Sequence, residues 1–307
     1  MRQPPEQGDQ DGTGIDNVSV PARLKGLRAV VSQLIGAFVR AILVALLIAL
    51  PSLILPGVGQ AAKEISMVFA LVGAALTMFE YGSSHPGLVE FRFAPPFNRI
   101  RFISLFLTIL LLAMMFRGEA GGNEMTRMVG QIGFLVGKAM DFPFSPVRIL
   151  TSLLTNDGQT GNSDIVRSAA GISYVVSLVS LASFAIFVRL LAWPLGHGSF
   201  NVWVNLPTFD PAASFDVEAR LIRDARVNVI FGFTLPFLLP MVAEVSSDYF
   251  TFSTLAGSQT LIWTVAAWAF LPASLFMRGI AFARIATLIR RKREKLHEPS
   301  TQDFAPA

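Results

Sequence analysis

The residue types that most often carry chemistry are scarce or isolated in this 307-residue sequence. It contains no cysteine, which excludes disulfides, thiolate metal sites and cysteine nucleophiles. No two of the three histidines share a metal-ligand spacing such as HExxH, the histidines being His85, His197 and His297. Ser145 has no evident base partner, so nucleophilic catalysis finds no support. The sequence therefore predicts no cofactor and favours a protein that is not an enzyme.

Ionisable side chains near or inside apolar stretches are stronger functional candidates, because a charge is costly to place in hydrocarbon. Arg40 and Arg189 each end a Phe-Val-Arg triplet at the edge of an apolar stretch, from which a long side chain can reach water. Glu244 lies near the edge of another stretch, and Lys138 and Asp141 lie at the end of an amphipathic segment. No stretch carries a central Asp, Glu, His or Lys, which argues against a proton- or ion-coupled transporter.

Two further groups are candidates for contacts rather than chemistry. Phe91, Phe93 and Phe97 alternate with charged residues in a proline-stiffened segment, and such rings are costly to leave in water. We expect them to dock on the membrane surface, on another loop or on a partner protein. The second group consists of basic residues that are each expected to add about 1 kcal/mol of attraction to anionic lipid head groups. These residues are Arg284, Arg290, Arg291, Lys292, Arg293 and Lys295.

The composition shows what kind of element must position these residues. Hydrophobic residues make up 52% of the chain and charged residues only 15%, against about 25% charged residues in an average protein. The mean hydropathy is +0.55. A soluble domain of this size could not bury so much apolar surface, whereas a lipid bilayer covers it. The net charge of +4 is explained by basic residues beside apolar stretches, so a membrane surface is expected as partner and nucleic acid is not.

The apolar stretches predict an all-α, polytopic membrane helix bundle with six spans, because a span needs about 20 mostly apolar residues. The predicted spans are residues 41–59, 64–79, 100–116, 169–193, 227–245 and 259–277. Arginine and lysine residues gather in alternate connections, which predicts that both termini are cytoplasmic. This pattern, without a targeting segment, points to a bacterial inner membrane.

The remaining segments complete a membrane domain over residues 21–295, between disordered cytoplasmic tails at 1–20 and 296–307. A basic amphipathic segment at 21–39 predicts an interfacial helix before the first span, the alternative being one long tilted helix. The cytoplasmic loop 194–226 is expected to contain an extended stretch and a helix that starts at Asp210-Pro211. A polybasic helix is expected over 278–295.

The long connection over residues 123–155 predicts a pair of short helices outside the cytoplasm, the first capped by Asn123. Glycines in the first helix permit close helix packing. The pair is interpreted as two interfacial helices, or alternatively as a re-entrant hairpin with Lys138 and Asp141 near its tip.

These features favour a non-catalytic membrane protein that acts as an accessory, assembly or scaffold component of a membrane complex, with a membrane-protein partner or self-association. The alternative is a transporter or channel for a small solute. It would use the 123–155 hairpin and the proline-broken first, fifth and sixth spans.

Overall fold

The computed structural model describes residues 22–83, 87–156, 163–191, 193–194, 205–206, 216–246 and 258–297. The helices in these residues are α1 (Ala22–Ile54), α2 (Gln60–Gly82), α3 (Phe97–Glu119), α4 (Glu124–Met140), α5 (Pro146–Asn156), α6 (Ser163–Leu190), α8 (Val217–Ser246) and α9 (Ser258–His297). Six of them, all except α4 and α5, are long and apolar enough to cross a membrane. The prediction of a helical bundle with six candidate spans is thereby confirmed, as judged by length and composition.

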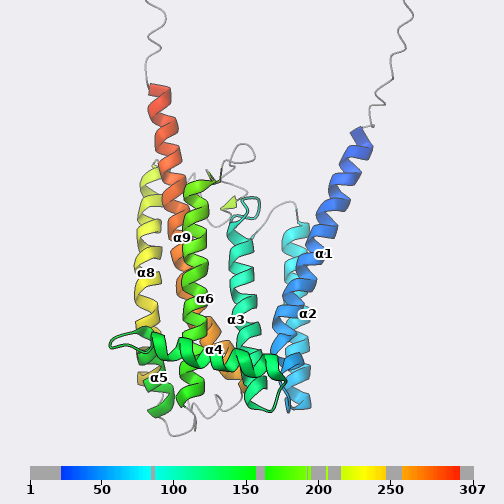
Figure 1. Cartoon of the computed structure of the whole chain (residues 1–307). Coiled ribbons are helices and arrows are strands. Elements are labelled where there is room, and N and C mark those ends of the chain that lie inside the picture. Colours follow the sequence, from blue (N-terminus) through cyan, green and yellow to red (C-terminus); the bar gives the residue numbers. More distant parts are fainter. Residues whose placement is uncertain are drawn as a thin grey trace, which may run out of the picture.

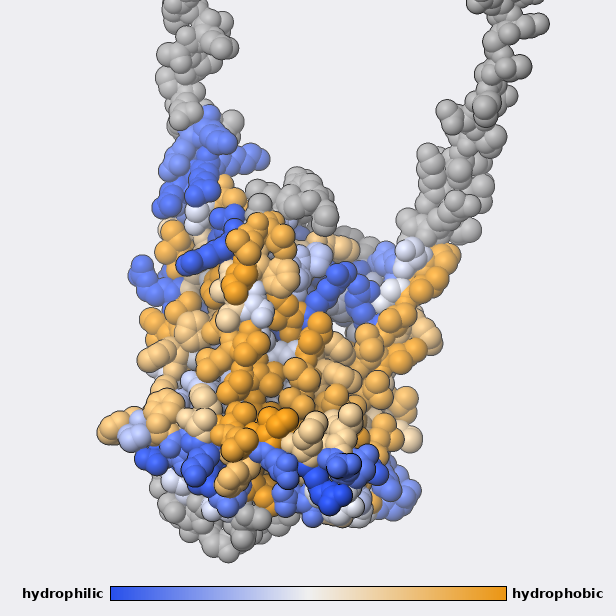
Figure 2. Space-filling view, in the orientation of Figure 1, coloured by the Kyte–Doolittle hydropathy of each residue, from blue (hydrophilic) through white to orange (hydrophobic). Residues whose placement is uncertain are grey.

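The long helices run side by side, and the N-terminal end of α1 and the C-terminal end of α9 lie at the same end of the bundle (Figure 1). We call this the terminal end, and the opposite one, which carries α4 and α5, the α4 end. Apolar side chains form a band between hydrophilic residues at the two ends of the molecule (Figure 2). Such a band is the surface expected of a protein whose middle is covered by lipid.

α1 is one helix of 33 residues, where a separate interfacial helix over 21–39 was the expected arrangement and a single long helix the alternative. No proline interrupts the helix before Pro51, so its backbone hydrogen bonds continue through the expected boundary. The helix ends at Ile54, shortly before Pro56 and before Gly57, whose φ of 74° suits a residue without a side chain.

The centre of the bundle is formed by α3, α6 and α9, with α8 packed along α9 (Figure 1). Ile109, Leu112, Ala169, Ile262 and Val265 are each 0% exposed in this core. Small residues on α6 let neighbouring helices approach closely, as is usual in membrane bundles. The core therefore depends on packing between helices that are far apart in the sequence.

The α1–α2 hairpin stands beside this centre and is tied to it at the α4 end. Gln259 at the start of α9 donates to the hydroxyl oxygens of Ser52 on α1 and Ser66 on α2, at 2.9 and 2.7 Å. Arg117 on α3 donates to the carbonyl oxygen of Ile54 at 2.8 Å. Toward the terminal end, α1 leans away from α3 (Figure 1).

α4 lies across the long helices rather than along them (Figure 1). Its predicted cap is present, because the Asn123 side chain accepts a hydrogen bond from the Thr126 backbone N–H at 3.0 Å. α4 crosses α6 where Gly137 meets Gly171, and a Cβ atom on Gly171 would stand 2.6 Å from the Gly137 Cα. Only glycine allows this approach, so the crossing point is set by these two residues.

Candidate functional site

A cavity of about 1360 Å³ lies near the terminal end, between the α1–α2 hairpin and α3, α8 and α9. We call it the arginine pocket, because four arginines are among its lining residues: Arg40, Arg99, Arg101 and Arg278. Most of the other lining side chains are apolar and come from all five helices and the α2–α3 connection. The pocket therefore combines a cationic part with apolar walls.

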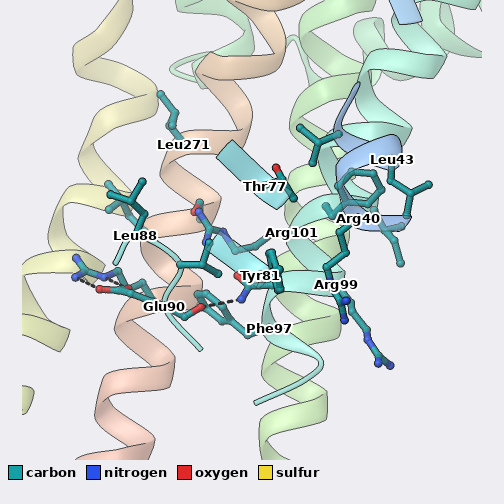
Figure 3. Close-up of a pocket in the computed structure, with 18 of the residues that line it drawn as sticks. Arg40, Leu43, Thr77, Tyr81, Leu88, Glu90, Phe97, Arg99, Arg101 and Leu271 are labelled. Atoms are coloured by element: carbon teal, nitrogen blue, oxygen red, sulfur yellow. Dashed lines mark hydrogen bonds and ion pairs between the residues drawn. The ribbon is translucent and has the colours of Figure 1, made fainter. Parts of the chain in front are cut away.

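Arg101 occupies the middle of the pocket, between Leu271 and Tyr81 in the view of Figure 3. Its guanidinium carbon lies 5.2 Å from the ring centre of Phe97 and 5.9 Å from that of Phe270, distances at which cation–π attraction operates. Its Nε atom is buried and has no hydrogen-bond partner among the described residues. Two rings thus hold a guanidinium whose donors are not all used by the protein.

Arg278 is paired with the one carboxylate among the described lining residues. Its Nε and Nη2 atoms donate to the two carboxylate oxygens of Glu90 at 2.7 and 2.6 Å, a bidentate geometry (Figure 3). Asn98 donates to the Glu90 carbonyl oxygen at 2.7 Å. These contacts fasten the α2–α3 connection to α9, so that Glu90 and Arg278 form a fixed edge of the pocket.

Arg40 on α1 and Tyr81 on α2 form the side of the pocket that the hairpin contributes. Arg40 donates from Nη1 to the carbonyl oxygen of Gly36 at 2.6 Å, and its guanidinium carbon lies 4.8 Å from the Tyr81 ring centre. Arg99 is exposed at the start of α3. Among the described residues, neither Arg40 nor Arg99 forms an ion pair.

Two charged groups beside the pocket are structural. Arg92 donates to the carbonyl oxygens of Glu80, Tyr81 and Ser83 at 2.7, 2.6 and 2.9 Å, and so caps the C-terminus of α2. Burial lowers the pKa of Arg92 from its ordinary value, and the nearby Glu80 carboxylate opposes that shift. The buried Glu80 carboxylate accepts hydrogen bonds from the backbone N–H groups of Leu88 and Val89, at 2.8 Å each.

The aromatic residues of the connection were expected to dock on the membrane surface, on another loop or on a partner protein, and two of the three pack within the chain itself. Phe91 and Phe97 are 1% and 0% exposed, with ring centres 4.5 Å apart. They pack in a cluster with Phe184, Trp193 and Phe282, because burial inside the protein removes their rings from water. Phe93 is 58% exposed and lies under the Arg92 guanidinium.

Lys138 and Asp141 do not line the arginine pocket, and neither does any other residue of 123–155. Lys138 is exposed on α4. Asp141 follows the end of α4 and accepts from Arg148 at 2.8 Å and from Arg167 at 3.5 Å. These contacts link the turn between α4 and α5 to Arg148 on α5 and to Arg167 on α6.

The remaining predicted residues lie outside the pocket. Arg189 is exposed in the last turn of α6, and the side chain of Glu244 in α8 is outside the described residues. Arg284 is half-buried and donates from Nε to the Trp193 carbonyl oxygen at 3.1 Å, so one of its hydrogen-bond donors is already used within the chain. Arg293 pairs with Asp216 at 3.3 Å. The exposed basic residues of α9 are Arg290, Arg291, Lys292, Arg293 and Lys295.

The loop over residues 194–226 is described only in part. The expected helix start at Asp210-Pro211 and most of the expected extended stretch lie outside the described residues, as do His85, His197, the tail 1–20 and residues 298–307. Residues 296 and 297, expected in the second tail, are the last two residues of α9. Within the described part, Asp216 caps α8 by accepting the backbone N–H groups of Glu218 and Ala219 at 3.1 and 3.4 Å. The Ala219 N–H lowers the pKa of the Asp216 carboxyl most, assisted by Arg293.

Within the part of the chain that the structure describes, no group of three or more His, Cys, Asp or Glu residues is placed to hold a metal ion. Sequence reasoning did not single out Tyr81, Glu90, Arg101 or Arg278 as site residues. The sequence feature that could have pointed to the site is the pair Arg99 and Arg101, which lie between two phenylalanines in the first turns of α3.

Comparison with protein-family models, with curated proteins and with solved structures finds no match to this chain.

Proposed function

We propose that this chain is a non-catalytic membrane protein that holds an acidic amphiphile in the arginine pocket, in an accessory role within its membrane. The observation that carries the proposal is the pocket's composition, with apolar walls along the helices and arginines concentrated at one part. A lipid-like molecule matches this composition, because it combines apolar chains with an anionic head group. The Glu90 carboxylate is already held by Arg278, which supports binding rather than acid–base chemistry.

Electrostatics supports an anionic ligand over a neutral one. Arg40, Arg99 and Arg101 line one cavity without an ion pair to any described residue. Like charges that line the same partly apolar cavity repel one another, and an anion placed among them is attracted to each of them.

Access from the bilayer supports a ligand with hydrocarbon chains. Leu43, Ile103 and Leu271 line the pocket on helices long and apolar enough to span a membrane, and are 39%, 60% and 51% exposed. A chain attached to a head group in the pocket can leave past these residues into lipid without crossing a polar surface. The pocket then works as a lateral binding site.

We place this pocket in the cytoplasmic leaflet of a bacterial inner membrane, with both termini cytoplasmic. The support is the basic residues that gather at the terminal end, on α9 and at the start of α3. A reporter that is active only in the periplasm, fused after Ala307, should give no signal. Activity of that fusion would overturn the orientation.

The binding proposal is tested on protein purified in a mild detergent that retains native lipids. Native mass spectrometry should show an acidic lipid that survives detergent exchange. Leu43→Trp places a large ring in the pocket and should abolish retention, whereas Ile42→Trp, at a neighbouring exposed position outside the lining, should keep it. Equal retention by the two variants would overturn the proposal.

A further inference from the structure

The arginine pocket presents more positive charge than a singly charged head group needs. Arg278 is neutralised by Glu90, whereas Arg40, Arg99 and Arg101 are not ion-paired within the described residues. A phosphodiester or a fatty-acid carboxylate brings one negative charge. A phosphomonoester brings about 1.5 to 2 negative charges at pH 7.

The arrangement of the donors also suits a tetrahedral group. The Arg101 side chain comes from α3, reaches the middle of the pocket, and keeps an unused buried Nε donor. Arg40 reaches the pocket from α1, and its Nη1 atom donates a hydrogen bond to the Gly36 carbonyl oxygen. Guanidinium groups that arrive from different helices can each take a different oxygen of a phosphate with three free oxygens. A planar carboxylate offers two oxygens, which one guanidinium fork can satisfy.

We propose that the arginine pocket selects lipids whose head group ends in a phosphomonoester, with Arg101 as the residue that determines this preference. The inference rests on the proposed binding function and adds the class of head group. Arg101 is the selecting residue because Phe97 and Phe270 hold its guanidinium in place, so its donors cannot follow a poorly matched head group. Arg40 and Arg99 supply the additional positive charge.

The test uses the full chain in nanodiscs of a neutral lipid doped with equal amounts of three acidic lipids of matched chain length: phosphatidate, phosphatidylglycerol and a fatty acid. The lipids that remain bound after transfer to detergent are quantified by mass spectrometry. We expect phosphatidate to be retained about tenfold over phosphatidylglycerol, the factor that one charge-assisted hydrogen bond provides. Fatty acid should be retained least.

Variants separate recognition from folding. Arg101→Gln should bring phosphatidate and phosphatidylglycerol to similar retention, and Arg99→Gln, at an exposed position, should reduce the ratio without disturbing the fold. Arg189→Gln removes a charge at the same end of the bundle but outside the lining, and should leave the ratio unchanged. A ratio that is unchanged in both Arg101→Gln and Arg99→Gln would overturn the role of these residues.

Two outcomes distinguish the two proposals. Equal retention of all three lipids, still abolished by Leu43→Trp, would overturn the head-group inference and leave the binding function standing. Retention that no pocket variant changes would overturn both. Inorganic phosphate at millimolar concentration should displace little bound phosphatidate, and complete displacement would show a site for free phosphate instead of a lipid.

Discussion

Phe91 and Phe93 belong to the same short connection but are predicted to differ sharply in their effect on stability. Phe91 is 1% exposed, and its ring centre lies 4.5, 5.5 and 6.0 Å from those of Phe97, Trp193 and Phe282. Truncation of a buried phenylalanine to alanine typically costs about 3–5 kcal/mol. Phe91→Ala should therefore lower the free energy of unfolding by about that amount.

Phe93 provides the matched control. It is 58% exposed, and its described ring contact is the Arg92 guanidinium at 4.8 Å, which is worth about 0.5–1 kcal/mol at an exposed site. The two alanine variants should thus differ by about 3 kcal/mol. Denaturation with sodium dodecyl sulfate in mixed micelles measures the difference, followed by the intrinsic fluorescence of the chain's four tryptophans, of which Trp193 lies in the same cluster. Equal losses for the two variants would refute the placement of Phe91 inside the chain.

Three further predictions concern α4, the Glu90–Arg278 pair and the α8 cap. Gly137→Val should destabilise by about 1–3 kcal/mol or more, because its Cβ would stand 2.8 Å from backbone atoms of α6, whereas Gly130→Ala, with its nearest contact at 3.8 Å, should be tolerated in the same thermal unfolding assay. Glu90→Gln removes a partly exposed ion pair and should cost about 1–2 kcal/mol, seen as faster tryptic cleavage in the α2–α3 connection. The pKa of Asp216 is lowered in the folded chain, so Asp216→Ala should reduce thermal stability at pH 7. That difference should disappear as the pH falls through 3.8, its ordinary value, toward the lower folded value.

The span count could be predicted because hydropathy is a local property of the sequence. Hydropathy alone does not give the helix boundaries, as α8 shows. Its helix starts at Val217, ten residues before the apolar stretch predicted over 227–245. The helix expected from Asp210-Pro211 onward already covers the polar residues between, and within the described residues Asp216 caps their first turn. The helix pair over 123–155 was predictable for the same local reasons, through the Asn123 cap.

The arginine pocket could not be predicted from the sequence, because its residues come together only through tertiary packing. In the sequence, Arg101 and Arg278 look like the basic residues that flank any span on the cytoplasmic side. Their roles depend on Phe270 and Glu90, which are far away in the chain. For Phe91 the need for burial is clear from the sequence, whereas the sequence does not choose among the membrane surface, another loop and a partner protein as the surface that buries it.

The loose attachment of the α1–α2 hairpin sets an order of assembly. α2 finds its main neighbour in α1, the preceding helix, so the hairpin can form as soon as both have entered the membrane. The bond from Arg117 to Ile54 can form once α3 is in place, but the bond from Gln259 to Ser52 must wait, because these two residues are 207 residues apart. The arginine pocket waits too, since α9 supplies Arg278 and Leu271 to its wall. During synthesis the chain therefore passes through membrane-inserted states that lack the arginine pocket. The pocket is complete only after α9 has joined the bundle.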